Sequence, residues 1–236
     1  MKIKFVHAYG DQETYDIQYC RPTLELDGSP EIDAVESGWV MYNGVWYQQR
    51  NSRIRVAEYP EKFKHIQHHK VIYEDPIDMT DEHYYVFKTF LKKRGFRYNY
   101  DVDTDMDRAA CLSVYSEQGL VAFTKFIKYD GALESQFTAW DYGEPKLSIG
   151  RRLIDYEVEQ ARKMGYDYLY VGPSYGLSAI YKSKLPGFEW WTGSEWSNDA
   201  DKYVEICERD ASVTSLASLH RVVNEHAFAS FSKETA

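Results

Sequence analysis

The chain has 236 residues, of which 44% are hydrophobic and 28% are charged, and its formal net charge is −9. This is the composition of an ordinary globular protein. The negative net charge argues against broad, non-specific nucleic-acid binding. It is compatible with a local basic patch that holds an RNA end. No segment approaches the ~20 apolar residues of a membrane helix, residues 1–9 lack the apolar run of a signal peptide, and the three cysteines are far apart. We therefore expect a cytoplasmic protein with no membrane partner and no metal site.

The first 60 residues are expected to form short strands and loops. Asn43-Gly44 lies between two apolar segments, 39–41 and 45–47, and supplies the positive-φ residues of a tight hairpin turn. A strand is expected at 53–56.

Residues 61–70 are predicted to form a short exposed helix. It would place His65 and His69 one turn apart, a spacing that could bind a metal. No carboxylate or cysteine partner is implied, so we favour a solvated helix face.

A longer helix is predicted to begin after Thr80. The Thr80 side chain can cap the first turn, Asp81 and Glu82 suit the positive end of the helix dipole, and Gly95 can end the helix.

The second half of the chain alternates strands, turns and helices. The third predicted strand is followed by a helix ending at Gly165, and this helix leads into a buried strand. The predicted elements are strands at 109–116, 119–128, 132–140 and 166–171, and helices at 150–164, 178–184 and 212–229.

This order predicts an α/β (α+β) fold with a mixed, mostly antiparallel sheet, one βαβ crossover and an N-terminal β-rich extension. We divide the chain into an N-terminal β-rich region at 1–75, a core at 76–200, and a C-terminal strand or helix region at 201–236 that packs on the core. A sheet of this kind favours a ligand cleft where neighbouring strands part.

The segment 178–188 resembles the A-x-x-x-Y-x-x-x-G-F segment of GNAT acyltransferases, with a slightly longer interval before Gly187-Phe188. The resemblance implies a GNAT-like core in which Tyr181 is the general acid that protonates the leaving group. The alternative is a helical tyrosine that packs beneath the sheet.

Residues 35–190 also resemble aminoacyl-tRNA–protein transferases of the arginyl and leucyl type. The resemblance lies in the order of short motifs: Gly38-Trp39 in the first hairpin, Ala139-Trp140-Asp141, Ser148-Ile149-Gly150 before a long helix, Tyr168-Leu169-Tyr170-Val171-Gly172, and Tyr181-Lys182. The clustered N-terminal cysteines that such proteins usually carry are missing, since Cys20 stands alone. This departure puts their N-degron specificity in doubt here.

The resemblance implies roles for particular residues. An aminoacyl ester is already activated, so the enzyme must position an amine, remove a proton and stabilise the oxyanion. Glu134 and Asp141 are the candidate bases, and Tyr181 or Lys182 would assist departure of the ribose oxygen. The expected substrate-binding residues are Ser148, Gly150, Arg151, Arg152, Trp140, Tyr170, Arg50 and Arg53. Arg151 and Arg152 could instead lie in a solvated first turn of the helix. Arg50 and Arg53 could instead reflect the ordinary alternation of side chains on a strand.

We thus expect transfer of an aminoacyl group from charged tRNA to an amine. The expected acceptors are protein or peptide N-termini, and aminoacyl-tRNA is the co-substrate, with no other cofactor. One alternative is an N-acetyltransferase that uses acetyl-CoA, although the Q/R-x-x-G-x-G/A pyrophosphate turn is broken around Gly150. Another is a catalytically silent binding protein of the same shape.

Overall fold

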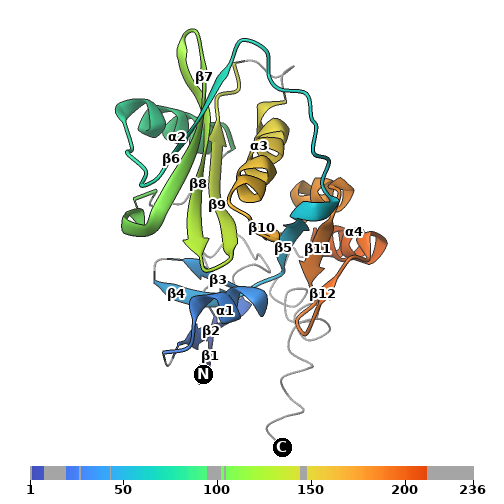
Figure 1. Cartoon of the computed structure of the whole chain (residues 1–236). Helices are drawn as coiled ribbons and strands as arrows, with labels where there is room; N and C mark the ends of the chain where they lie inside the picture. Colours follow the sequence, from blue (N-terminus) through green and yellow to red (C-terminus); the bar gives the residue numbers. More distant parts are fainter. Residues whose placement is uncertain are drawn as a thin grey trace, which may run out of the picture. The chain divides into compact units, whose positions relative to one another are not determined.

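The computed structural model describes residues 2–7, 20–26, 28–42, 44–94, 102–103, 105–143 and 148–211. The chain forms two compact units (Figure 1). One consists of Met1–Arg55 together with Val171–Ala236, and the other of Val56–Tyr170.

The Val56–Tyr170 unit is built on a sheet with the strand order β10-β9-β8-β7-β6. The pairs β6/β7, β7/β8 and β8/β9 are antiparallel, whereas β9 and β10 are parallel. The strands are β6 (Lys70–Glu74), β7 (Ala109–Ser116), β8 (Gly119–Tyr129), β9 (Ala132–Trp140) and β10 (Tyr168–Pro173). Short 3₁₀ segments, η2 (Val56–Glu58) and η3 (Met106–Arg108), precede two of these elements.

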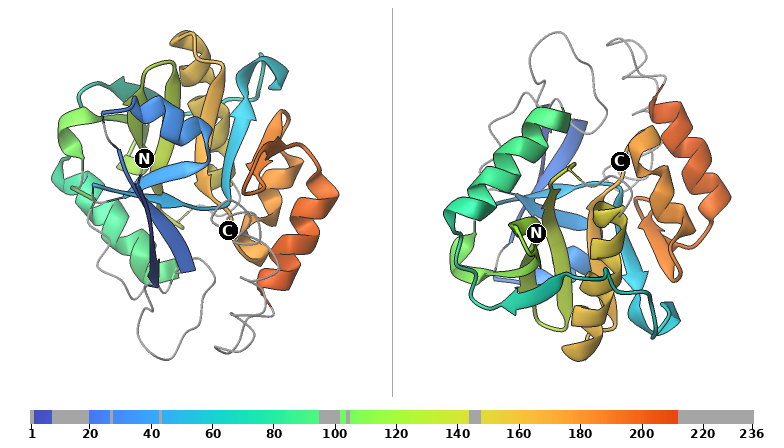
Figure 2. Two further views of the ribbon diagram at one scale, coloured as in Figure 1. Left: turned by 90° about the horizontal axis from the view of Figure 1, so that it is seen from below. Right: turned by 90° about the horizontal axis from the view of Figure 1, so that it is seen from above.

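Two helices cover opposite faces of this sheet. His83 and Phe87 of α2 (Asp81–Arg94) contact the rings of Phe123 and Phe137. Glu157 of α3 (Ile149–Lys163) instead accepts a 2.6 Å hydrogen bond from the Thr124 hydroxyl. Phe123 and Thr124 are adjacent on β8, and adjacent residues of a strand point to opposite faces of the sheet. Helices α2 and α3 therefore lie on opposite sides of the sheet, as Figure 1 and Figure 2 show. Helix α3 links the parallel strands, which is the predicted βαβ crossover.

The other unit contains a four-stranded antiparallel sheet of order β1-β2-β4-β3 and the three strands β12-β11-β5. Its strands are β1 (Lys2–His7), β2 (Cys20–Glu25), β3 (Trp39–Tyr42), β4 (Val45–Gln48), β5 (Asn51–Arg55), β11 (Phe188–Trp191) and β12 (Trp196–Ser197). Its helices are α1 (Glu31–Glu36), the 3₁₀ helix η5 (Leu177–Lys184) and α4 (Ala200–Asp210). Gly38 has a φ of 77°, and a Cβ there would lie 2.3 Å from the Trp191 ring, so only glycine fits.

The mixed, mostly antiparallel sheet with one crossover confirms the predicted fold class. The hairpin at 39–47 is confirmed, with Gly44 at a φ of 71°, as are the helix after Thr80 and the three strands from 109 to 140. The helix expected at 212–229, Asn43 and Gly95 lie outside the described residues.

One prediction of secondary structure is wrong, because residues 61–69 contain no helix. This segment is held by tertiary contacts instead of its own backbone hydrogen bonds. The backbone N–H of Ile66 donates to the Tyr156 hydroxyl at 2.8 Å, and the guanidinium of Arg152 donates to the Lys64 carbonyl at 2.6 Å. His68 has a φ of 62°, which is incompatible with a right-handed helix.

Within the described part of the chain, no helix is both long enough and apolar enough to cross a membrane.

Candidate functional site

Glu134 is a buried carboxyl group at the point where the parallel strand pairing ends. The parallel register pairs Ala132, Leu133 and Glu134 of β9 with Tyr168, Leu169 and Tyr170 of β10, and β9 then continues to Trp140. The side chain of Glu134 is 1% exposed. The Tyr129 hydroxyl donates to its Oε2 atom at 2.7 Å.

The environment of Glu134 raises the pKa of its carboxyl group from 4.5 to about 7. Burial is the largest cause, because removing a carboxylate from water disfavours its charged form. The Tyr129 hydrogen bond and the charge of Arg108 oppose this effect without cancelling it, and Asp105 adds to it. A pKa of about 7 means that the carboxyl group of Glu134 is divided between its protonated and charged forms near neutral pH.

An aromatic cluster packs against the first turn of α3. A Cβ added at Gly150 would lie 2.9 Å from the Trp140 ring, so the glycine allows the indole to pack against the first turn. Trp140 also lies against Phe90, with ring centroids 4.6 Å apart, and against Tyr142 at 5.6 Å. Ser148 has a φ of 50°, and its side chain makes no capping hydrogen bond. The need for glycine at position 150 is thus explained by its close packing against the Trp140 ring.

The remaining predicted residues near α3 have protein partners. Arg151 forms a 2.9 Å ion pair with Asp155, whose carboxylate also accepts a hydrogen bond from the Tyr59 hydroxyl. Asp141 follows the end of β9 and accepts a 3.1 Å hydrogen bond from the backbone N–H of Gly143. Tyr170 is fully buried.

Arg152 lines a groove with a volume of about 670 Å³. The other walls are the segments 64–69 and 116–118. We name this feature the 64–69 groove. The sequence did not reveal it, because its walls come from three separate parts of the chain that only the fold brings together.

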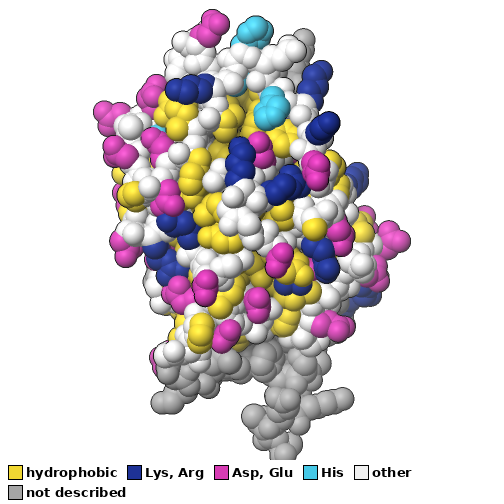
Figure 3. All heavy atoms as spheres, in the orientation of Figure 1, with side chains coloured by type: hydrophobic (Ala, Val, Ile, Leu, Met, Phe, Trp, Pro, Cys, Tyr) yellow, Lys and Arg dark blue, Asp and Glu magenta, His cyan; other side chains and the backbone are white. Residues whose placement is uncertain are grey.

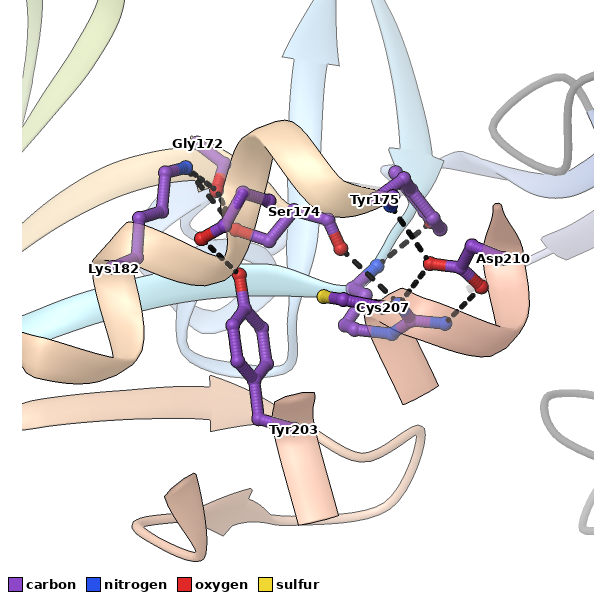
Figure 4. Close-up of polar contacts among 10 residues, drawn as sticks. Gly172, Ser174, Tyr175, Lys182, Tyr203, Cys207 and Asp210 are labelled. Carbon is purple, nitrogen blue, oxygen red and sulfur yellow. Dashed lines mark hydrogen bonds and ion pairs between the residues drawn. The ribbon is translucent and has the colours of Figure 1, made fainter. Parts of the chain in front are cut away.

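In the other unit, Tyr181 and Lys182 are neighbours with opposite environments. Tyr181 on η5 is 46% exposed, so its ring is not sealed in the interior. The Lys182 side chain is buried, and its ammonium donates to the Val171 carbonyl at 2.6 Å. It also donates to the Ser174 hydroxyl at 3.1 Å (Figure 4). Other oxygens within 3.4 Å belong to Ser52, Gly172 and Pro173.

This arrangement ties the end of β10 to η5, since a single ammonium bonds several successive carbonyls. Tyr203 of α4 holds η5 from the other side, with its hydroxyl donating to the Ala179 carbonyl at 3.1 Å. The backbone around Tyr181 is thereby fixed by buried polar contacts. Ser52, Ser174 and Tyr203, which no sequence pattern singled out, contribute to this support.

Arg50 and Arg53 both pair with carboxylates. Arg50 forms a bidentate ion pair with Asp210, at 2.6 and 3.2 Å, and its guanidinium lies over the Tyr175 ring (Figure 4 shows Asp210 and Tyr175). Arg53 donates to Glu189 at 2.6 Å and lies over the Trp196 ring at 4.2 Å. Burial acts to raise the pKa of Glu189, but its hydrogen bonds from Arg55 and Arg53 prevail, so the pKa is lowered.

Among the described residues, no group of three or more histidine, cysteine, aspartate or glutamate side chains is placed to hold a metal ion. Cys111 and Cys207 are both buried free thiols.

Neither a family model nor a curated protein matches this chain. Solved structures that it resembles include L-PGS from Bacillus licheniformis (16% identity, TM-score 0.43, 53% of this chain and 46% of that one). Others are the C-terminal domain of a proposed lysylphosphatidylglycerol synthetase from Agrobacterium fabrum (12%, 0.45, 79% and 60%) and a GCN5-related N-acetyltransferase from Kribbella flavida (12%, 0.38, 53% and 48%). The chain thus matches less than two thirds of each of these structures, and at such TM-scores the likeness decides neither fold nor activity.

Proposed function

We propose that this chain is an acyltransferase that moves an aminoacyl group from charged tRNA to an amine. The observation that carries the proposal is Glu134, a fully buried carboxyl group whose pKa is raised to about 7 beside the end of the β9/β10 pairing. A buried carboxylate is costly to the fold, and groups with such perturbed pKa values concentrate at functional sites. Support also comes from the order of the transferase-like motifs, which fall on β9, α3, β10 and η5.

The proposed reaction needs one base and one acid. The amine nitrogen attacks the ester carbonyl and loses a proton to Glu134, while the carbon–oxygen bond to the terminal ribose breaks. The departing ribose oxygen takes a proton from an acid, for which Tyr181 is our candidate because its ring is exposed on a well-supported helix. The products are an amide and an uncharged tRNA.

The amine acceptor is proposed to be a protein or peptide N-terminus. Support for this acceptor comes from the motif order, which resembles that of aminoacyl-tRNA–protein transferases. A short peptide with a free N-terminus is therefore the first acceptor to test.

Ligand binding tests the proposal against its rivals. A ligand that binds only the folded state raises the unfolding temperature. We expect stabilisation by aminoacylated tRNA that exceeds the effect of the same tRNA without its amino acid. Stabilisation by acetyl-CoA alone would identify an N-acetyltransferase, and no response to any of the three would identify a silent binding protein.

A tyrosine variant tests the acid. Tyr181→Phe removes the hydroxyl while keeping the ring, so we expect tRNA binding to be preserved and turnover to fall by roughly 10²–10⁴-fold. Tyr85→Phe is the matched control, because Tyr85 is 68% exposed on α2 and has no proposed role. Equal turnover in the two variants would remove Tyr181 from the mechanism.

A further inference from the structure

We propose that the 64–69 groove binds the ribose–phosphate backbone of single-stranded RNA. The inference rests on the proposed function in one respect, namely that the RNA in question would be the end of the charged tRNA. The groove is lined by Lys64, three histidines and Arg152, with Glu117 as its one carboxylate. Lys64 and Arg152 against the single carboxylate of Glu117 give the groove a local positive charge, which phosphate recognition needs because the chain as a whole is acidic.

The wall formed by residues 64–69 is fixed in place before any ligand arrives. Helix α3 holds it through the Tyr156 hydroxyl, which accepts from the Ile66 backbone at 2.8 Å, and through Arg152, which donates to the Lys64 carbonyl at 2.6 Å. The rings of Phe63 and Tyr156 also meet edge to face, with centroids 5.4 Å apart. A wall that is already ordered loses little conformational entropy when it binds.

His69 adds a hydrogen-bond acceptor to these positive charges. Its Nδ1 atom lies 2.8 Å from the Gln67 carbonyl, and because a carbonyl oxygen can only accept, Nδ1 must carry the proton. In the neutral ring Nε2 is then an acceptor, and within the described chain this buried atom has no hydrogen-bond partner. A buried acceptor without a donor is costly, so a ligand hydroxyl that bonds to it would be favoured.

Together these groups match RNA more closely than they match a membrane. A ribose 2′-hydroxyl is a donor for Nε2 of His69, and the neighbouring phosphates are partners for Lys64 and Arg152. The one apolar lining residue, Ile66, is only 7% exposed, so the groove offers no hydrophobic anchor to a bilayer. Acidic and basic side chains are interspersed over the face drawn in Figure 3, which disfavours general adhesion to an anionic surface.

The test is binding of a short, labelled, single-stranded RNA to the full chain, measured by fluorescence anisotropy at several salt concentrations. Two phosphate contacts predict a slope of about −1.4 for log K against log salt, because each contact contributes about −0.7 on a single strand. Lys64→Ala and Arg152→Ala should each reduce the slope by about 0.7. Lys62→Ala is the matched control, since Lys62 is exposed in the same segment and does not line the groove.

A DNA strand of the same sequence tests the hydroxyl. The native chain should prefer RNA by about fivefold, the value of one hydrogen bond, and His69→Leu should abolish the preference while leaving the salt slope unchanged. Circular dichroism of each variant checks that the fold is retained.

Several results would overturn the inference. They are equal losses in Lys62→Ala and Lys64→Ala, equal binding of RNA and DNA by the native chain, and binding to anionic phospholipid vesicles but not to RNA. Because the RNA carries no amino acid, the assay does not depend on catalysis. Groove-dependent RNA binding without transfer would refute the proposed function alone, whereas transfer that is unchanged in Lys64→Ala and Arg152→Ala would refute the groove alone.

Discussion

Replacing Glu134 by glutamine should change how the stability of the protein depends on pH. Glutamine has nearly the same shape as glutamate and carries no charge at any pH. In the native chain the folded pKa of this carboxyl group is about 7, against an ordinary value of 4.5. The folded state therefore binds its proton more tightly than the unfolded state does.

The sign and size of the effect follow from this difference. Stabilisation by the bound proton is fully present below pH 4.5 and is lost as the pH rises through about 7. A difference of about 2.5 pKa units corresponds to roughly 3 kcal/mol of unfolding free energy. Relative to the native chain, Glu134→Gln should thus gain roughly 3 kcal/mol in stability between pH 4.5 and about pH 8.

Urea unfolding monitored by tryptophan fluorescence across this pH range measures the difference. Glu61→Gln is a suitable control, because Glu61 is an exposed carboxylate in the same compact unit. If the stability difference between Glu134→Gln and the native chain stays constant with pH, Glu134 titrates as an ordinary carboxyl group. Glu134 would then lack the raised pKa proposed for the base.

Three further predictions concern packing and buried polar groups. Gly150→Ala should destabilise the protein by about 1 kcal/mol in urea unfolding, because overpacking against Trp140 outweighs the gain in helix propensity. The same substitution should become stabilising in a Trp140→Leu background. Destabilisation in both backgrounds would contradict the role of Trp140. Arg50→Ala should cost roughly 3–5 kcal/mol by the same method, since it leaves Asp210 buried without its bidentate partner, and a loss below about 1 kcal/mol would show that the pair is solvated. Burial lowers the pKa of His83, whose Nδ1 atom accepts a hydrogen bond from the Thr80 backbone N–H, so the contribution of this histidine to stability should be lost as the pH falls below about 6.5. His83→Gln should weaken that acid dependence in a pH series of unfolding curves. An unchanged dependence would count against a neutral histidine.

Much of the fold could be predicted from local signals. Gly119, Gly131 and Gly165 mark the turns that separate the strands and end α3, and each has a positive φ. The segment 61–69 was mispredicted because its conformation is set by Tyr156 and Arg152, which lie far away in the sequence.

The candidate site could be predicted only in part. The pattern of motifs drew attention to Glu134 and Tyr181, but the burial that raises the pKa of Glu134 depends on residues from several strands. The sequence predicts that Arg50 binds substrate and that Lys182 assists departure of the ribose oxygen. Their partners, Asp210 and the carbonyls around Gly172, are brought to them by the tertiary fold.

The most direct test of aminoacyl transfer is a single-turnover reaction with bulk tRNA charged with labelled amino acids. The protein is supplied in excess together with peptides that carry free N-termini, and the label is followed from an alkali-labile ester to an alkali-stable amide. We predict amide formation by the native chain and its loss in both Glu134→Gln and Tyr181→Phe. Aminoacyl transfer would be refuted if the label left the tRNA no faster than in buffer while the same peptides were acetylated from labelled acetyl-CoA.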